Sequence, residues 1–363
     1  MISYGRQSIN QRDIDSVVAV LSGDWLTQGP TIEKFESALA EYVDAAYAVS
    51  FSSGTAALHA AAWAAGLGPG DVAFTSPLTF MATANAARYV GATPGLVDIS
   101  RDTWNIDLGL LPERAKAVFP VHYAGLPVDL SRPSWQERPE IVIEDAAHAL
   151  GAFTPDGPVG NCASSDMTCF SFHPVKPLTT GEGGMVTTNN SDLADRLRRF
   201  RNHGILRKPE HGGWYYEISD LGYHYRMTDM QAALGLSQLS RIDSFIAKRN
   251  NVAVTYRHEL SALPLELPPE APNGYLHGYH LFPVLVENRA FAFEEFHRLG
   301  IAVQVHYVPV HHHPISQDLA NFGQEFPEAE RVYRGVLSLP IFPELTEDQV
   351  RFVAETVPRV LGN

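Results

Sequence analysis

MTCFSFHPVKPLTTGEGG, residues 167–184, places a lysine just after a short apolar run. The run at 167–172 predicts a buried strand, and open α/β sheets place their ligands at the carboxyl ends of such strands. Pro174 and Pro177 stiffen the segment around Lys176. An amine partly removed from water loses proton affinity and becomes a nucleophile able to form a Schiff base. Lys176 is therefore a candidate catalytic residue, and the alternative is a surface lysine in a turn.

Short apolar runs alternate with helical patterns from the amino terminus to about residue 235. The runs lie at 72–76, 95–99, 117–123, 141–145, 167–172 and 184–189. This alternation predicts an α/β fold with a mostly parallel central sheet covered by helices. At 363 residues the chain exceeds the usual size of a single core, so we expect two domains.

A long helix is expected to begin near Thr228, whose spacing to Gln231 is that of a capping box, and to bridge the two domains. A Pro-rich stretch at 263–274 follows, and then the patterns of a small α+β domain. The predicted division is 1–235 for a large cofactor-binding domain and 236–363 for the bridging helix and the small C-terminal domain.

The formal net charge is −14, and the sequence has no clustered stripe of Lys and Arg. Nucleic acid and anionic membranes both need a cationic surface, so neither is expected as a partner. The sequence shows no bilayer-spanning apolar run and no signal sequence at its start, so we expect a cytoplasmic protein. Cys162 and Cys169 are seven residues apart, which suits neither a disulfide framework nor a CxxC metal pair.

A carboxylate ends a second apolar run, IVIED at 141–145. Asp145 is thus expected at the carboxyl end of a strand, with His148 one helical turn further on. The protonated ring nitrogen of a bound pyridine would require such a carboxylate. The alternatives are a helix N-cap for Asp145 and a hydrogen-bonded histidine near the core for His148.

Two further segments place binding groups after predicted strands. Ser53, Gly54 and Thr55 lie before an Ala-rich helix, and hydroxyls and free N–H groups at a helix N-terminus bind phosphate. Phe80 offers a flat face on which an aromatic ring could stack. An ordinary capped helix and a core phenylalanine are the alternatives. Lysine, carboxylate, phosphate cradle and stacking ring together are the groups that pyridoxal phosphate requires of a protein.

Eight segments distributed along the chain share the pattern of a known family. They are SSGTAALH, SPLTFMATANA, VHYAGLPVDL, EDAAHALGA, SFHPVKPLTTGEGG, RNHGI, LGYHYRMTDMQAALGLSQL and VHYVPVHHHP. Through them the chain resembles the DegT/DnrJ/EryC1/StrS sugar aminotransferases over essentially its whole length. The resemblance implies the aspartate aminotransferase fold (PLP fold type I), pyridoxal 5'-phosphate as cofactor, and a homodimer whose active sites each use residues of two subunits.

By this resemblance Lys176 binds the cofactor covalently and then moves a proton between the sugar carbon and the cofactor carbon. Asp145 keeps the pyridine nitrogen protonated, while His148 lies near the ring hydroxyl. Phe80 stacks on the ring. The remaining cofactor-binding residues are expected at Ser53, Gly54, Thr55 and Ser171, together with His224 reaching a neighbouring subunit.

The substrate contacts implied by the resemblance fall on three segments: Tyr4; Asp24, Trp25, Leu26 and Thr27; and Gln304, Val305, His306 and Tyr307. The opening GRQSINQRDIDSVVAVLSGDWLTQGP, with SFHPVK and QVHYVPVH, resembles the branch that aminates a UDP-linked 4-keto-6-deoxy-N-acetylhexosamine on the way to pseudaminic acid. The expected reaction moves an amino group from an amino acid, with glutamate as the expected donor, to C4 of that nucleotide-linked keto sugar. A dTDP-linked 4-keto sugar or a 3-keto sugar is the alternative acceptor.

Three features depart from the family pattern. His224 stands where the family usually has an asparagine that reaches the phosphate or substrate of the neighbouring subunit. The chain between 128–135 and 141–145 is shorter than usual, so a crossover is expected to be reduced to a loop. Trp104 stands where a tyrosine is common, which we interpret as a packing change.

Two other functions compete with this one. A sugar dehydratase on the same scaffold would have histidine in place of Lys176. A cofactor-binding regulator without catalysis would have a damaged lysine loop or aspartate, and both are intact in this sequence.

The histidines at 311–313 suggest a metal site. However, adjacent side chains on an extended segment point to opposite faces, and no Cys or carboxylate pair stands at ligand spacing. We therefore predict no metal and interpret the run as a substrate-facing loop.

Overall fold

A seven-stranded sheet forms the centre of the computed structural model, which describes residues 1–131, 135–319 and 325–362. From one edge to the other the strands are β1 (Tyr47–Phe51), β9 (Gly184–Thr188), β8 (Met167–Ser171), β5 (Ile141–Asp145), β4 (Ala117–Phe119), β2 (Val72–Thr75) and β3 (Thr93–Leu96). β9 runs antiparallel to both of its neighbours, and the other pairs are parallel. The predicted mostly parallel sheet is confirmed, and each apolar run predicted as a strand overlaps one.

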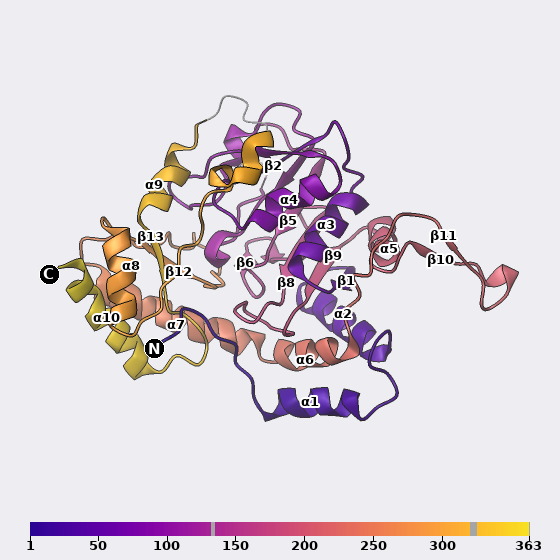
Figure 1. The fold of residues 1–363 in the computed structure, drawn as a ribbon, viewed down its shortest axis with the longest axis horizontal. Helices are drawn as coiled ribbons and strands as arrows, with labels where there is room; N and C mark the ends of the chain where they lie inside the picture. Colours follow the sequence, from indigo (N-terminus) through magenta and orange to yellow (C-terminus); the bar gives the residue numbers. More distant parts are fainter. Residues whose placement is uncertain (132–134, 320–324, 363) are drawn as a thin grey trace.

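Helices cover both faces of this sheet (Figure 1). On one face α3 (Gly54–Ala64), α4 (Met81–Tyr89) and α5 (Ser191–Phe200) enclose a core. On the other face α2 (Pro30–Tyr42), α6 (Asp229–Leu239) and the start of α7 (Ile242–Leu260) enclose a second core. Because side chains alternate along a strand, the neighbouring residues Cys169 and Phe170 of β8 enter different cores.

The predicted bridging helix begins where expected but is divided in two. Thr228 is the N-cap of α6 and forms the predicted capping box with Gln231. α6 ends at Leu239, and α7 begins at Ile242. The prediction of one uninterrupted helix is therefore wrong.

Side-chain bonds account for the break between α6 and α7. Ser240 Oγ donates to the Ser237 carbonyl at 2.7 Å, a bond that competes with the backbone hydrogen bonds of the helix. The next residue, Arg241, has φ −122° and ψ 3°, and its guanidinium pairs with the buried carboxylate of Asp13. The ion pair between Arg241 and Asp13 thus lies where the helix is interrupted.

After α7 the chain forms a second, smaller group of elements, coloured orange to yellow in Figure 1. They are β12 (Phe282–Leu285), α8 (Arg289–Arg298), α9 (Pro327–Gly335), β13 (Val336–Leu339) and α10 (Glu347–Leu361), with β12 antiparallel to β13. The apolar side chains of β12, α8, β13 and α10 share a core with the end of α7, whereas Ala329 and Val332 of α9 belong to another core, with Leu78 and Leu96 of the large sheet region. The amino terminus also joins this group, since Ile2 donates to the Gly300 carbonyl and accepts from the Ala302 N–H. The division at residue 235 stays a prediction.

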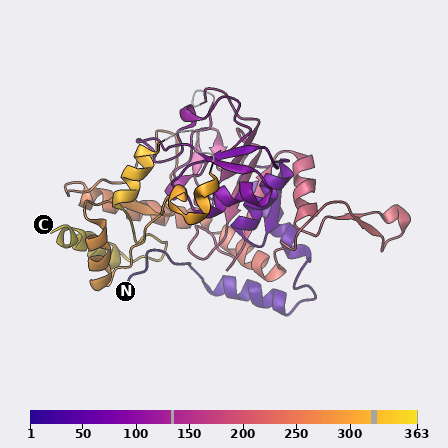
Figure 2. The same ribbon diagram turned by 45° about the horizontal axis from the view of Figure 1, so that its top comes forward.

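The remaining elements lie at the periphery. α1 (Gln11–Leu21) lies along α6, and β10 (Ile205–Arg207) with β11 (Tyr216–Ile218) forms a hairpin arm that extends away from the rest of the chain in both views (Figures 1 and 2). The short elements are β6 (Phe153–Thr154), β7 (Gly157–Pro158), η1 (Leu108–Leu110), η2 (Tyr123–Gly125), η4 (Pro209–His211), η5 (Val310–His312) and η6 (Pro314–Asp318). No described helix is long and apolar enough to cross a membrane.

Two predictions about local structure can be compared directly. Within 128–140, the residues that the structure describes form no helix, as expected for a crossover reduced to a loop. The histidine segment, in contrast, is not extended, because Val310–His312 forms the 3-10 turn η5. The premise that adjacent histidines point to opposite faces is therefore wrong.

Candidate active site

A cavity of about 650 Å³ lies at the carboxyl ends of the parallel strands. It is bounded by the residues that follow β1, β2, β5 and β8. Of the residues predicted from the sequence, those that line it are Tyr4, Ser53, Gly54, Thr55, Phe80, Asp145, His148, Ser171, Lys176, His306 and Tyr307. Segments from both ends of the chain thus converge on one space.

Lys176 is held at the cavity by the loop that follows β8. Thr179 Oγ1 and the Thr180 N–H both donate to the Phe172 carbonyl, at 3.1 Å and 3.0 Å, which closes this loop onto the end of the strand. Burial lowers the pKa of Lys176 to about 8, and the nearby Asp145 opposes that shift in part. A useful fraction of the amine is therefore neutral close to physiological pH, and the neutral amine is the nucleophile.

Asp145 is the last residue of β5 and is buried in the cavity wall. Its Oδ2 accepts a hydrogen bond from Thr83 Oγ1 at 2.7 Å, and its Oδ1 accepts one from the Ala147 N–H at 3.1 Å. Residues 147–151 form turns and no helix follows Asp145, so the alternative of a helix N-cap does not apply. Two fixed donors orient the carboxylate in the protein itself.

The N-terminus of α3 meets the end of β8 at the cavity. Ser53 caps the helix by accepting from the Ala56 N–H at 3.1 Å. A Cβ at Gly54 would lie 2.7 Å from Ser171 Cβ, so glycine is needed for this close approach. The first amides of a helix have no partner within it, and they offer a place for an anion.

Aromatic and imidazole groups form another part of the wall. Phe80 is 60% exposed, and its ring centre lies 6.0 Å from that of Tyr307. Tyr307 Oη lies 2.9 Å from His148 Nε2, while His148 Nδ1 is buried without a hydrogen-bond partner. Burial first, and then the charge of Lys176, lowers the pKa of His148 well below its usual value, so the ring is neutral.

The sequence did not indicate His280, which lines the cavity, or Thr83, which supports Asp145 of its wall. His280 lines the cavity, and its ring centre lies 4.3 Å from that of His148. Thr83 lies 62 residues before the carboxylate to which it donates. The one local signal for His280 is its position directly before an apolar run. Thr83 has no local signal, because its hydrogen bond to Asp145 exists only in the folded chain.

Seven predicted residues do not line the cavity: Asp24, Trp25, Leu26, Thr27, His224, Gln304 and Val305. Residues 24–27 connect α1 to α2, where Trp25 is 58% exposed. His224 follows the hairpin arm, and its Nε2 lies 2.7 Å from Arg226 Nη2. The resemblance implies active sites that take residues from two subunits, and the structure contains one subunit. The assignment of these seven residues therefore stays a prediction.

A second cavity, of about 760 Å³, lies between α7 and α10. Its lining mixes charges of both signs, such as Lys248, Glu344 and Arg351, and includes none of the residues predicted for a site. Its size alone gives no reason to place the chemistry there.

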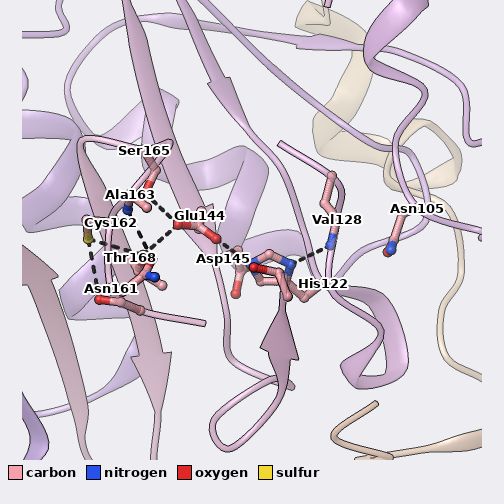
Figure 3. A network of polar contacts seen from close by, with 12 residues as sticks. Asn105, His122, Val128, Glu144, Asp145, Asn161, Cys162, Ala163, Ser165 and Thr168 are labelled. Carbon is pink, nitrogen blue, oxygen red and sulfur yellow. Dashed lines mark hydrogen bonds and ion pairs between the residues drawn. The ribbon is translucent and has the colours of Figure 1, made fainter. Parts of the chain in front are cut away.

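A buried polar network lies directly behind Asp145 (Figure 3). Glu144 precedes Asp145 on β5 and points to the other side of the strand. His122 Nε2 lies 2.8 Å from Glu144 Oε2, and the hydroxyls of Ser165 and Thr168 donate to Oε1 at 2.5 Å and 2.8 Å. Both oxygens of the Glu144 carboxylate therefore have hydrogen-bond partners.

The same network fixes the backbone at the cavity. The Val128 N–H donates to His122 Nδ1 at 2.9 Å, so the ring proton lies on Nε2 and points to Glu144. The His122 N–H donates to the Asp145 carbonyl at 3.1 Å. The loop after β4 is therefore tied to β5 at the residue that presents its carboxylate to the cavity.

A Glu144→Gln variant is expected to unfold about 1–3 kcal/mol more easily than wild type at pH 7, the usual cost of an unsatisfied buried group. Burial would raise the pKa of Glu144, but the bonds from His122, Ser165 and Thr168 outweigh it and lower that pKa. A carboxylate whose pKa is lowered by folding stabilises the protein above the unfolded pKa, and this contribution is lost as pH falls through the folded pKa.

The difference between wild type and Glu144→Gln should therefore shrink on acidification below about pH 4.5, the value for an unperturbed glutamate. Urea unfolding at neutral and acidic pH measures it, with the exposed Glu355→Gln as control. A difference that stayed constant with pH would contradict the role of the charged carboxylate.

Known proteins resemble this chain over nearly its whole length. A profile described as the DegT/DnrJ/EryC1/StrS aminotransferase family matches residues 7–358. The UDP-4-amino-4,6-dideoxy-N-acetyl-beta-L-altrosamine transaminase of Campylobacter jejuni subsp. jejuni serotype O:2 is 35% identical over 376 residues, covering 99% of this chain and 98% of that protein.

Solved structures share the fold over nearly the whole chain. Helicobacter pylori PseC, described as an aminotransferase involved in the biosynthesis of pseudoaminic acid, has a TM-score of 0.91 and 32% identity, covering 99% of both chains. The PLP form of Spr1654 from Streptococcus pneumoniae has a TM-score of 0.90 and 28% identity, covering 99% of this chain and 98% of that one. The expected aspartate aminotransferase fold is confirmed.

Proposed function

Because the chain belongs to the DegT/DnrJ/EryC1/StrS aminotransferase family, we propose that it moves an amino group from L-glutamate to C4 of a UDP-linked 4-keto-6-deoxy-N-acetylhexosamine. The chain is a pyridoxal phosphate-dependent aminotransferase of nucleotide sugars. The proposal rests above all on Lys176 and Asp145, a buried amine and an oriented carboxylate on the wall of one cavity. The choice of sugar is supported by the similarity to the Campylobacter transaminase.

The residues present fit pyridoxal phosphate. Phe80 exposes an aromatic face to the cavity, and the N-terminus of α3 offers unpaired amides for a phosphate. His148 Nδ1 is a buried polar atom that still lacks a partner. When bound, the cofactor supplies an electron sink for the negative charge that develops at the reacting carbon.

Each group then has a role that its environment supports. Lys176 Nζ would hold the cofactor covalently between turnovers and would carry the proton between the reacting carbons during them. A pKa of about 8 lets this amine accept and release a proton near physiological pH. Asp145 would keep the ring nitrogen of the cofactor protonated, since an adjacent carboxylate favours a positive charge. Thr83 holds that carboxylate in place.

The sugar contacts are assigned to Tyr4, His306 and Tyr307, which line the same cavity. Burial, and then the charge of Lys176, lowers the pKa of His306 to about 3, so its ring is neutral. His306 Nδ1 lies 2.9 Å from Ser338 Oγ, which leaves Nε2 as the ring nitrogen for a ligand. Neutral hydroxyl and imidazole groups suit the hydroxyls of a sugar.

A panel of UDP- and dTDP-linked 3-keto and 4-keto sugars, incubated with the protein and glutamate, tests this function. The expected product, identified by NMR, is the 4-amino derivative of the UDP-linked sugar. A dTDP-linked or 3-amino product would overturn the choice of sugar. If borohydride traps a cofactor adduct on Lys176 but no sugar is aminated, the protein is a cofactor-binding regulator instead.

We also propose a homodimer whose active sites take residues from both chains. The hairpin arm and the residues after it expose Trp214, Tyr216, Ile218 and Leu221, with Trp214 78% exposed, and the arm extends away from its own chain (Figure 2). Apolar patches of this kind are typical of interaction surfaces. Sedimentation velocity should give about twice the 39.9 kDa mass of one chain, and a monomer at micromolar concentration would contradict the proposal.

A further inference from the structure

Three potential metal ligands meet outside the active-site cavity. His311 Nε2 and His312 Nε2 each lie 2.7 Å from the same oxygen, Glu330 Oε1. The three ligand atoms all lie within 4.8 Å of one another. None of these residues lines the cavity that holds Lys176.

The two histidines are placed by the turn η5. The Val310 N–H donates to the Pro77 carbonyl at 2.9 Å, and the Ser316 hydroxyl donates to the Val310 carbonyl at 2.5 Å. The 3-10 turn brings the adjacent rings of His311 and His312 together, with centres 4.6 Å apart and planes at 78°. Both rings can therefore address one point in space.

Glu330 is placed independently by α9. Asp98, buried in the large sheet region, accepts from the N–H groups of Glu328 and Ala329 at 2.9 Å each. These bonds fix the first turn of α9, from which Glu330 points to the histidines. Neighbouring rings also contact the histidines, since Phe326 lies 4.9 Å from His311 and Tyr333 lies 5.2 Å from His312, centre to centre.

The donor atoms of the group suit a cation, because neutral imidazole and ionised carboxylate are the forms that bind metal ions.

We propose that His311, His312 and Glu330 form a binding site for a transition-metal dication of the Zn²⁺ class. Two imidazole nitrogens and one carboxylate oxygen suit Zn²⁺, whereas Mg²⁺ and Ca²⁺ prefer oxygen ligands alone. In a tetrahedral site with bonds near 2.0 Å the ligand atoms lie about 3.3 Å apart, which small side-chain rotations can reach from the separations seen. Water would take the fourth position.

Such an ion would link η5 to α9. η5 begins three residues after Tyr307 of the active-site wall, so the ion would brace the segment that carries this wall. The ion takes no part in amino transfer, and the inference does not depend on the proposed substrate.

Calorimetric titration of the chelator-treated holoenzyme with ZnCl₂ tests the site. Wild type should bind one ion per chain with micromolar or lower Kd, and thermal unfolding should shift upward with added Zn²⁺. Glu330→Gln keeps an acceptor for both histidines but removes the charge, and it should weaken binding by at least about tenfold. His312→Gln should have the same effect.

His313→Gln is the matched control, because His313 lies beside the group but is not a member of it. It should bind Zn²⁺ as wild type does. Any ion held by the cofactor phosphate would bind to every variant alike and would not change the comparison between them. Wild-type binding in both Glu330→Gln and His312→Gln, or no saturable binding in wild type, would overturn the proposal. Unchanged amino transfer in wild type with and without Zn²⁺ would confirm that the site is separate from catalysis.

Discussion

A Lys176→Ala variant is expected to lose amino transfer by a factor on the order of 10³ or more. The side chain is assigned both the covalent hold on the cofactor and the proton transfer, and general acid–base catalysis alone contributes on the order of 10² to 10⁴. Among the described residues, no other lysine lines this cavity, so no second amine can replace that of Lys176. Glutamate-dependent amination of the keto sugar, followed by NMR, measures the loss.

The exposed Lys34→Ala is the control for this change, and it should retain wild-type turnover. Thermal unfolding of both variants separates loss of chemistry from loss of fold. Lys176→Ala should also lose the visible absorbance of covalently bound cofactor. A variant that kept wild-type turnover would remove the basis of the proposed function.

The pH dependence of cofactor uptake provides an independent test of the same lysine. Because burial holds the pKa of Lys176 at about 8, only the neutral fraction of the amine reacts below that pH. The rate at which cofactor-free protein takes up pyridoxal phosphate should therefore rise about tenfold per pH unit below pH 8 and level off above it. An ordinary exposed lysine would continue to gain reactivity to about pH 10.5.

An Asp145→Asn variant is expected to lower kcat by a factor on the order of 10² to 10³, the usual effect of removing one preorganised charge from an active site. The amide has nearly the same shape, and its oxygen can still accept from Thr83 or Ala147. It cannot, however, hold a positive charge on the cofactor ring as a carboxylate does. Single-turnover kinetics with glutamate would show the loss in the chemical step.

Asp166→Asn is the matched control. Asp166 lies just before β8 at the opposite end of the sheet, where its Oδ2 accepts from the Val142 N–H at 2.8 Å. This variant should lose some stability and keep the rate of the chemical step. If both variants slowed that step equally, the loss in Asp145→Asn would be due to disturbed folding and not to the missing charge.

The parts of the site that sequence could predict are those that directly follow strands. Lys176 and Asp145 stand after apolar runs, and the ends of parallel strands meet at one edge of a sheet, so their convergence follows from topology alone. The N-terminus of α3 follows from the same argument. The cavity contains all of these groups.

Contacts between distant segments could not be predicted in this way. Thr83 meets Asp145, and His280 meets His148, only because the folded chain brings separate elements together. The break at Arg241 depends on Asp13 of another helix, so helical periodicity could not reveal it. The turn at Val310–His312 likewise depends on the Pro77 carbonyl, which captures the Val310 N–H.

The pairing of the amino terminus with the C-terminal elements has a practical consequence for purification. Ile2 forms backbone hydrogen bonds with Gly300 and Ala302. Two residues later, Tyr4 lines the cavity, and its carbonyl accepts from the Ile341 N–H at 3.0 Å. An affinity tag fused ahead of Met1 would begin within a few residues of Tyr4 and of the wall proposed to contact the substrate. No residue of α10 lines the cavity, so a tag placed after this helix is the better design for activity assays.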